Sequence, residues 1–277
     1  MRKKINTGKV VLVGAGPGDP ELLTIKALRY LQRADVVLTD RLVSETIISD
    51  YVNANTKVIY VGKQFRRAAS MPQKTINELM IGYALQGKLV VRLKGGDVSI
   101  FSNIHDELET LAAEGIPYEI VPGVTAALGA AAYSGIPLTA RGYSTAVRFL
   151  TCYKSDVITE EYWKELAQTN DTLVFYMSSE TLNGVVKKLT TYGMNPDKLI
   201  AVIEQATTPF QYVQTASLYN YEKEFGNRRL ASPSLVIIGK VVALHQQFGW
   251  LKNNLVKEEY FKTIADRLIP YTNKKRA

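Results

Sequence analysis

The sequence predicts an α/β protein of one large or two modest domains. Short apolar runs of strand length alternate with amphipathic helical segments, a pattern typical of βαβ units around a largely parallel sheet. The clearest strand pattern covers residues 89–94 and stops at the glycine pair Gly95-Gly96. With 277 residues and 46% hydrophobic content, the chain has ample material for packed cores.

The predicted elements fall into two halves. In the first half we expect strands at 10–13, 36–38, 58–61, 89–94 and 118–121, helices at 21–34, 73–86 and 106–114, and a helix of small residues ending at Ser134. In the second half we expect strands at 146–151, 172–177, 199–204 and 235–238, with helices at 160–167 and 182–192. These elements predict an N-terminal domain at 8–140 and a C-terminal domain at 144–245, joined by a crossover at 141–143. Residues 246–277 are predicted to form a basic amphipathic helical tail that packs on the body or on a second subunit.

Composition limits the possible functions. The net charge of +8 fits an anionic partner, but the tail carries seven Lys and Arg against three Asp and Glu, so half of the excess lies there. The remainder is spread through the body, which indicates a basic cleft rather than a nucleic-acid-binding stripe. One cysteine and two histidines offer no metal-ligand cluster, so we expect no metal site. The sequence contains no apolar span of membrane length, and we expect a cytoplasmic protein that binds no membrane.

Candidate functional residues follow the strands of the first half. Because the carboxyl ends of parallel strands meet at one edge of a sheet, Pro17, Asp40, Lys63 and Asp97 should lie in one crevice there. The pair Gly95-Gly96, lacking Cβ atoms, would let a small ligand approach the backbone. Each of these residues also has an ordinary structural interpretation, such as a tight turn at Gly95-Gly96, a helix cap at Asp40 or a solvated charge at Lys63.

The glycine-rich loop after the first strand invites a dinucleotide-binding interpretation. The spacing in Gly14-Ala15-Gly16-Pro17-Gly18-Asp19-Pro20 argues against it, because Pro17 removes a backbone donor and Pro20 delays the helix. A loop stiffened by two prolines is better suited to forming the wall of a site than to holding a pyrophosphate.

Several ordered blocks together resemble the uroporphyrinogen III C-methyltransferases of the tetrapyrrole methylase family. The resemblance covers roughly residues 8–245 at near-family spacing, and the blocks read VGAGPGD at 13–19, TDRLVS at 39–44, VGK at 61–63, VRLKGGD at 91–97, VPGVTA at 121–126, YSGIPLT at 133–139, LVFYM at 173–177 and IGKVVAL at 238–244. It implies the tetrapyrrole methylase fold, in which two α/β domains hold S-adenosylmethionine in an active-site cleft between them, usually in a homodimer.

The resemblance also implies roles for individual residues. The positions that match cofactor contacts are Pro17, Gly95, Gly96, Asp97, Ile100, Thr125, Ala126, Met177 and Ala206. The acid and base of relatives fall on Asp40 and Lys63. Methyl transfer from a sulfonium to carbon requires mainly that donor and acceptor be held in line, which agrees with the scarcity of histidine and cysteine. S-adenosylhomocysteine would be the second product.

The implied substrate is uroporphyrinogen III, methylated on rings A and B to give precorrin-2 for sirohaem or cobalamin synthesis. Its eight carboxylates suit a basic crevice, with Arg41, Arg66 and Arg141 as candidate partners beside Lys63 and Arg67. Each transfer must be followed by loss of a proton, which Asp40 would accept, while Lys63 donates elsewhere.

The chain departs from the family pattern on the substrate side. Val98-Ser99 replaces the usual Pro-Phe, Asn103 stands where an arginine is expected to meet the macrocycle, and Ala140 replaces a histidine. Ala206 stands where relatives often have glycine. Asn103 cannot form an ion pair with a propionate, so we expect His105 or Arg66 to compensate.

Two alternatives stay open, and a third is disfavoured by the sequence. A later corrin-pathway methylase shares the block at 121–126, although Asp40-Arg41-Leu42-Val43-Ser44 favours the first enzyme. A ribosomal RNA methylase of related fold should carry an Asp-Ala-Gly-Thr-Pro type of turn where Lys94-Gly95-Gly96-Asp97 stands, and this chain does not carry it. A non-catalytic relative that binds cofactor or tetrapyrrole is suggested by Asn103 and Ala140.

Overall fold

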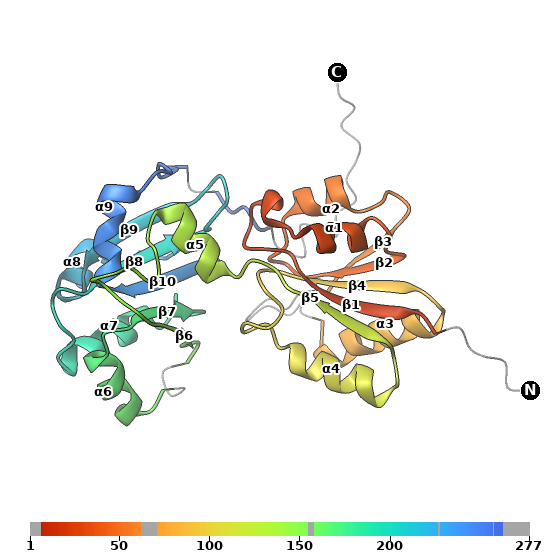
Figure 1. The fold of residues 1–277 in the computed structure, drawn as a ribbon, viewed down its shortest axis with the longest axis horizontal. Helices are drawn as coiled ribbons and strands as arrows, with labels where there is room; N and C mark the ends of the chain where they lie inside the picture. Colours follow the sequence, from red (N-terminus) through yellow and green to blue (C-terminus); the bar gives the residue numbers. More distant parts are fainter. Residues whose placement is uncertain (1–6, 62–70, 155–157, 227, 257, 263–277) are drawn as a thin grey trace, which may run out of the picture. The chain divides into compact units, whose positions relative to one another are not determined.

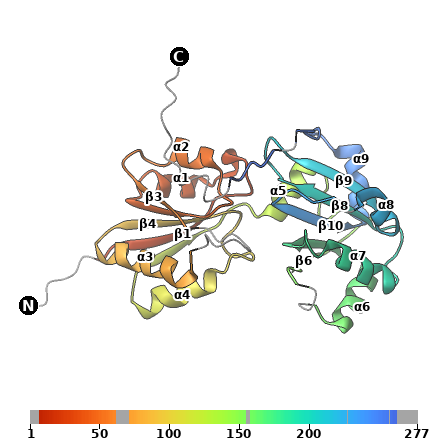
Figure 2. The same cartoon turned by 180° about the vertical axis from the view of Figure 1, so that it is seen from behind.

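The computed structural model describes residues 7–61, 71–154, 158–226, 228–256 and 258–262. The chain divides into two compact units, the first formed by residues 1–124 with 261–277 and the second by residues 125–260. Figures 1 and 2 show the elements of each unit from opposite sides.

The first unit is built on a fully parallel five-stranded sheet of order β3-β2-β4-β1-β5. The strands are β1 (Lys9–Gly14), β2 (Val36–Thr39), β3 (Lys57–Tyr60), β4 (Leu89–Lys94) and β5 (Tyr118–Val121). All five strands run in the same direction, so the loops after them leave the sheet at one edge. This arrangement confirms the parallel sheet predicted for the first half.

Helices cover both faces of this sheet (Figure 1). Helices α1 (Ile25–Leu31) and α2 (Glu45–Tyr51) cover one face, and α3 (Gln73–Leu85) and α4 (Ile104–Ala113) cover the other. Alternate residues of each strand supply the two cores: Val91 and Leu93 pack on the side of α1 and α2, whereas Val90 packs with Ile76 and Met80 of α3. Arg92 and Lys94 share the parity of Val90 and therefore point to the side of α3 and α4.

The second unit contains a mixed five-stranded sheet of order β6-β7-β10-β8-β9. Its strands are β6 (Val147–Thr151), β7 (Thr172–Tyr176), β8 (Leu199–Glu204), β9 (Tyr212–Ser217) and β10 (Ser234–Gly239). Strand β10 lies antiparallel between β7 and β8, whereas β6 and β7 are parallel. Helices α6 (Glu160–Gln168), α7 (Leu182–Thr191) and α8 (Tyr221–Phe225) cover one face, and α5 (Ala126–Ser134) covers the other with the short 3₁₀ turn Lys240–Leu244.

The N-terminal helix differs from the prediction. Instead of one helix over 21–34, a 3₁₀ turn at Pro20–Leu22 precedes α1, which starts only after Thr24. Thr24 Oγ1 accepts a hydrogen bond from Ala27 N at 3.2 Å and so caps α1, while Asp19 accepts one from Glu21 N at 2.8 Å. Helices α2 and α8 and strand β9 were not predicted, because each is short or has an irregular apolar pattern.

The division between the units lies earlier in the chain than the predicted crossover at 141–143. Helix α5 packs in the second unit, where Ala127 and Ala130 lie against Val174 and Ala201. Its small side chains allow this close approach to the sheet.

The predicted tail helix is wrong for the part that the structure describes. After α9 (His245–Phe248), residues 249–256 and 258–262 contain no helix or strand. Phe261 is buried in the first unit, whereas Leu255 is exposed. The apolar residues of this segment therefore do not share one helical face. Ile264 and Leu268, which also belonged to the predicted helix, lie outside the described residues.

None of the helices in the described part of the chain combines the length and apolar character needed to cross a bilayer.

Glu119 of β5 joins the edge of the first sheet to α1. Its carboxylate pairs with Lys26 at 2.5 Å and with Lys9, and accepts a hydrogen bond from the Tyr30 hydroxyl at 2.6 Å. The bonds from Lys26, Lys9 and Tyr30 lower the pKa of Glu119 to about 2.

We expect Glu119→Gln to destabilise the protein by on the order of 1 kcal/mol at pH 7, because the charged partners are partly solvent-screened. A folded-state pKa below the unfolded value of about 4.3 means that this contribution is present at neutral pH and disappears as the pH falls toward 2. Scanning calorimetry from pH 7 to pH 2.5 should show the difference between wild type and Glu119→Gln shrinking below pH 4. The control is Glu114→Gln, at an exposed position of the same unit. A difference that does not change with pH would contradict this account.

Candidate active site

The loops after β1 and β4 are joined backbone to backbone at the carboxyl edge of the first sheet. Gly96 N donates to Gly16 O at 2.7 Å, and Gly16 N donates to Gly96 O at 3.1 Å. Pro17, the next residue, is thereby held beside the turn that follows β4. Two of the predicted cofactor segments thus lie next to each other.

The glycines at this edge are required by close packing of the backbone. A Cβ at Gly14 would lie 2.6 Å from Gly123 N, and one at Gly95 would lie 2.6 Å from Leu42 O, both closer than real Cβ contacts allow. Gly96 has φ 69°, a left-handed conformation that suits glycine. Part of the space beside Gly95 is therefore filled by the loop after β2.

Asp97 links the loops after β4 and β5. Its Oδ1 accepts a hydrogen bond from Ser99 N at 2.7 Å, and its Oδ2 accepts one from Gly123 N at 2.9 Å. A carboxylate has about four acceptor positions, so these two bonds leave acceptor capacity for a ligand. Asp97 thus shapes the edge of the site and can also contact a bound molecule. Ile100 follows in the same loop and is partly buried.

Asp40 belongs to a network of four charged side chains, and the other three are buried. Arg92 Nη2 lies 2.7 Å from Asp40 Oδ1, and Arg92 Nε lies 3.0 Å from Glu107 Oε1. Lys94 Nζ lies 2.9 Å from both oxygens of Glu107. The side chain of Glu107 has no exposed surface, and Arg92 and Lys94 are almost fully buried. The network thus contains two carboxylates and two cations, so its formal charge is balanced.

Burial and the neighbouring charges shift the pKa values of the two cations in opposite directions. Burial disfavours charge on Arg92, but the carboxylates of Asp40 and Glu107 outweigh it and raise the arginine pKa. For Lys94, burial is the larger effect and is reinforced by Arg92, so its pKa is lowered despite Glu107. Asp40 itself is partly exposed, so the network presents one carboxylate at the sheet edge.

Of the arginines predicted to bind the substrate, the structure describes Arg41 in the first unit and Arg141 in the second. Arg41 Nη1 donates to Phe261 O at 3.3 Å, which joins the loop after β2 to the C-terminal segment of the same unit. Arg141 is exposed in a turn of the second unit. Lys63, Arg66 and Arg67 lie outside the described residues.

The segment that departs from the family pattern begins helix α4. Asn103 occupies the N-cap position with φ 58°, and its amide donates to Asp106 Oδ2 at 2.8 Å. Asparagine tolerates this left-handed conformation better than most residues. His105, one of the predicted compensating residues, is exposed with Nδ1 3.5 Å from Glu109 Oε2.

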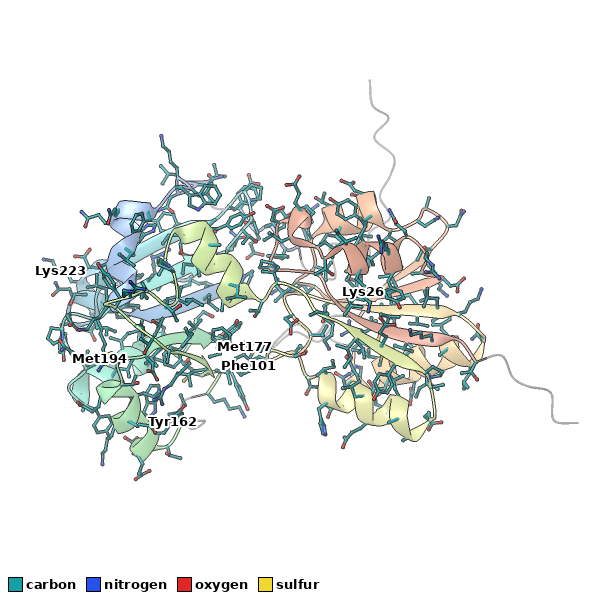
Figure 3. All side chains as sticks on the ribbon, viewed as in Figure 1. Lys26, Phe101, Tyr162, Met177, Met194 and Lys223 are labelled. Atoms are coloured by element: carbon teal, nitrogen blue, oxygen red, sulfur yellow. The ribbon has the colours of Figure 1, made fainter. Side chains whose placement is uncertain are left out.

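In the second unit, the predicted cofactor residues lie after β7, after β8 and at the start of α5. Met177 follows β7 in a left-handed conformation, with φ 54° and 51% of its surface exposed (Figure 3). Ala206 follows β8 and is buried between two left-handed residues, Gln205 and Thr207. Thr125 and Ala126 begin α5.

Backbone strain is concentrated in these loops. Among the described residues, the non-glycine positions with positive φ are Phe101, Asn103, Met177, Gln205 and Thr207. Each follows β4, β7 or β8, and each loop carries a predicted cofactor residue. Such conformations cost on the order of 1 kcal/mol or more and are concentrated at functional sites. The strained positions therefore lie in the same loops as predicted cofactor residues, a feature that the sequence did not show.

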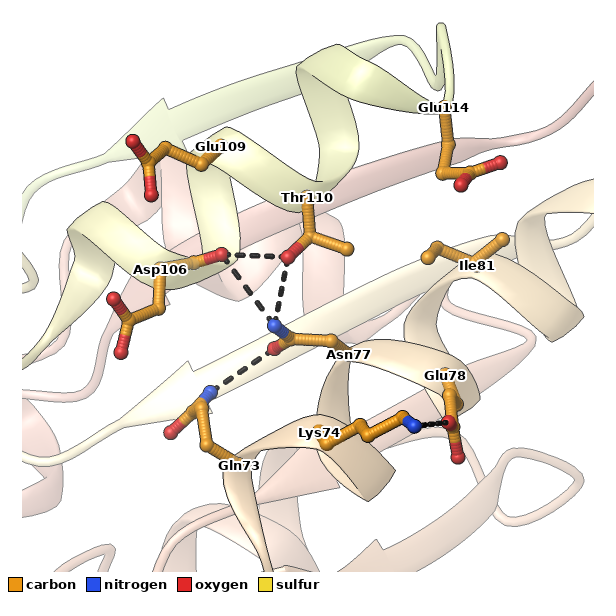
Figure 4. Close-up of a pocket in the computed structure, with 9 residues that line it drawn as sticks. All are labelled: Gln73, Lys74, Asn77, Glu78, Ile81, Asp106, Glu109, Thr110 and Glu114. Carbon is orange, nitrogen blue, oxygen red and sulfur yellow. Dashed lines mark hydrogen bonds and ion pairs between the residues drawn. The ribbon is translucent and has the colours of Figure 1, made fainter.

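A separate groove of about 490 Å³ lies between α3 and α4 (Figure 4). The amide of Asn77 at its centre bonds Thr110 Oγ1 at 2.8 Å and accepts from Gln73 Nε2 at 3.0 Å. These polar groups satisfy one another across the helix pair. No predicted site residue lines the groove, so we assign it to helix packing.

The sequence did not identify four side chains that bond to predicted site residues or to one another beside them: Arg92, Lys94, Glu107 and Tyr176. Arg92 and Lys94 were detectable in principle, because two charges alternate with Val91 and Leu93 in a strand that must be buried on both faces. Glu107 and Tyr176 carry no comparable signal, since their partners come from distant parts of the chain.

Comparisons with known proteins show what the chain resembles. The family model described as tetrapyrrole (corrin/porphyrin) methylases matches residues 9–221. The siroheme synthase of Acinetobacter baylyi is 47% identical over 244 residues, which are 88% of this chain and 53% of that protein. The siroheme synthase of Ruthia magnifica is 45% identical over 256 residues, or 92% and 54%. The chain thus spans about half the length of these curated relatives.

Solved structures are similar over most of the chain. A uroporphyrin-III C-methyltransferase from Thermus thermophilus matches with a TM-score of 0.73 and 33% identity, over 88% of this chain and 98% of that one. A structure of the Thermus thermophilus enzyme complexed with S-adenosyl homocysteine matches with a TM-score of 0.70 and 36% identity, over 86% of this chain and 100% of that one. A cobalt precorrin-4 methyltransferase matches with a TM-score of 0.75 and 29% identity, over 84% of this chain and 95% of that one.

The buried network makes a testable prediction about stability. Glu107→Gln removes one of two carboxylates that balance Arg92 and Lys94, so we expect the first unit to lose about 3 kcal/mol or more. Glu109→Gln, two residues away on the exposed side of α4, is the control and should change little.

Hydrogen exchange of peptides from β4 and α4 measures the effect. Because Trp163 and Trp250 both belong to the second unit, their fluorescence reports whether that unit stays folded. Equal exchange protection in the Glu107 and Glu109 variants would show that the network does not stabilise the unit.

Proposed function

Because the chain belongs to the tetrapyrrole (corrin/porphyrin) methylases, we propose that it methylates uroporphyrinogen III with S-adenosylmethionine as donor. Methylation at rings A and B gives precorrin-2, the proposed product, together with S-adenosylhomocysteine. The observation that carries the proposal is the similarity to the uroporphyrin-III C-methyltransferase from Thermus thermophilus over 88% of this chain. The siroheme synthase relatives support the same pathway.

The described residues fit the proposed donor. The proposal assigns cofactor contacts to Pro17, Gly95, Gly96, Asp97 and Ile100 of the first unit and to Thr125, Ala126, Met177 and Ala206 of the second. Met177 is exposed in a left-handed conformation, and Ala206 lies between two residues with positive φ. Strained backbone of this kind is typical of ligand-binding loops. When bound, S-adenosylmethionine supplies a methyl group on a positively charged sulfur.

The chain's contribution to the chemistry is mainly positional. An in-line displacement needs the two reacting atoms held roughly 3–3.5 Å apart and aligned, with no nucleophilic side chain. After methyl transfer the macrocycle must lose a proton, and we assign its acceptance to Asp40. Arg92 fixes one oxygen of that carboxylate at 2.7 Å, which leaves the group oriented at the sheet edge. Lys63, the proposed proton donor, lies outside the described residues.

Arg41, Arg66 and Arg141 are the proposed partners of the substrate carboxylates. The Phe261 carbonyl orients the guanidinium of Arg41, which follows Asp40 directly. An arginine at this position would bring a carboxylate-binding group next to the proposed base. Asn103 bonds within its own helix start, so the proposal gives it no ion-pairing role.

A second candidate is another methylase of the corrin pathway. The cobalt precorrin-4 methyltransferase structure matches with a TM-score of 0.75, comparable to the 0.73 of the Thermus enzyme. Sequence identity is 29% against 33%, and the curated relatives at 45–47% identity are siroheme synthases, which favours the first candidate. The homodimer and the cytoplasmic location expected from the sequence stay predictions.

We expect the purified chain, incubated anaerobically with uroporphyrinogen III and S-adenosylmethionine, to form precorrin-2, followed by its absorbance and by a mass increase of two methyl groups. Cobalt-precorrin-4 under the same conditions is the comparison substrate. Methylation of that corrinoid alone would support the second candidate. Binding of S-adenosylhomocysteine in calorimetry without turnover of either substrate would favour a non-catalytic relative.

Substitution of the two aspartates should separate binding from turnover. Asp40→Asn should reduce kcat by about 100-fold or more, the usual range for a general base, and leave the Kd for S-adenosylhomocysteine within about twofold. Asp97→Asn should weaken the binding of S-adenosylhomocysteine, because an amide has one acceptor oxygen and cannot accept from both Ser99 N and Gly123 N as the carboxylate does. Calorimetry and steady-state rates measure the two quantities. Parallel losses of affinity and kcat in both variants would refute this division.

A further inference from the structure

The hydroxyl of Tyr176 bonds to two points at the start of helix α5. It lies 2.7 Å from Thr125 Oγ1, and it accepts a hydrogen bond from Ala127 N at 3.1 Å. Tyr176 is the last residue of β7 and directly precedes Met177. One side chain therefore connects the loop after β7 with the helix start that carries Thr125 and Ala126.

These bonds replace the usual cap of the helix. Thr125 occupies the N-cap position of α5 with extended backbone, but its hydroxyl makes no capping bond. A capping side chain normally accepts from the second or third helical N–H, and here the Tyr176 hydroxyl accepts from the second, that of Ala127. The Thr125 hydroxyl is instead turned toward Tyr176.

Packing fixes the position of the tyrosine ring. The ring meets Phe149 of β6 edge to face at a centroid distance of 6.0 Å and packs against the core between α5 and the sheet. Beyond the ring, the chain turns at once into the left-handed conformation of Met177, with φ 54°. The hydroxyl is thus held at a fixed point relative to both Met177 and Thr125.

We propose that Tyr176 is a positioning residue for the cofactor, which it serves by holding Thr125, Ala126 and Met177 in their mutual arrangement. The inference rests on the proposed function, since it assumes that these three residues contact S-adenosylmethionine. Tyr176 acts through them. Its loss should affect the donor and leave the handling of the tetrapyrrole unchanged.

The test is Tyr176→Phe, which removes only the hydroxyl. We expect the Kd for S-adenosylhomocysteine and the KM for S-adenosylmethionine to rise by about five- to tenfold, as for loss of one or two hydrogen bonds, with the KM for the tetrapyrrole unchanged. Tyr219→Phe is the matched control, because its hydroxyl donates to Met194 O at 2.7 Å in the same unit, and this bond involves neither the start of α5 nor the loop after β7. It should lose a similar amount of thermal stability and no affinity.

A double-mutant cycle with Thr125→Val sharpens the test. If the two hydroxyls act as one unit, the double variant should bind S-adenosylhomocysteine about as weakly as Tyr176→Phe alone. Wild-type affinity in Tyr176→Phe, or equal increases in KM for both substrates, would overturn the inference and leave the proposed function intact. If the wild-type chain itself failed to bind S-adenosylhomocysteine, the proposed function would fail first.

Discussion

The site in the first unit depends on the ion pairs that the buried carboxylate of Glu107 forms with Arg92 and Lys94. A charge with no exposed surface is tolerated only when its partners satisfy it, and Lys94 and Arg92 do so from alternate positions of one strand. The same arginine reaches Asp40 at 2.7 Å, so the packing of α4 on the sheet also sets the orientation of the carboxylate at the sheet edge. Stability of the unit and geometry of the proposed base are therefore two effects of one network.

Backbone contacts hold together the loops at the carboxyl edge of the first sheet. Gly14, Gly95 and Gly123 stand where a Cβ would collide with a neighbouring main chain, and Gly16 and Gly96 are bonded to each other. The glycine-rich motifs thus allow the loops to pack on one another before any ligand is considered. A ligand at this edge would meet a surface preformed by these contacts, which lowers the ordering cost of binding.

Much of the fold was predictable because it follows from periodic patterns. The strands of both units other than β9, and the parallel direction of the strands in the first sheet, follow from alternating apolar runs and helices. Short elements such as α2 and β9 were missed. The tail helix was wrong for residues 249–256 and 258–262, where Phe261 packs into the first unit instead of joining a helical face. The strand pattern placed Asp97 at the carboxyl edge of the sheet, and its proposed role toward the cofactor came from resemblance to a family. The partners that hold them, Glu107 and Tyr176, depend on contacts between distant residues, which no local pattern records.

Asn103 shows how a departure from the family pattern is accommodated. The residue adopts φ 58° at the N-cap of α4, and its amide is bonded to Asp106 three residues later. Asparagine suits this conformation, and the helix it begins carries Glu107 one turn onward. Asn103 therefore begins α4 and helps to fix the position of the buried carboxylate, but its neutral amide cannot form an ion pair with a substrate carboxylate. Arg41, next to Asp40 in the loop after β2, is by contrast oriented by a bond to the Phe261 carbonyl, so the described residues fix a guanidinium beside the proposed base.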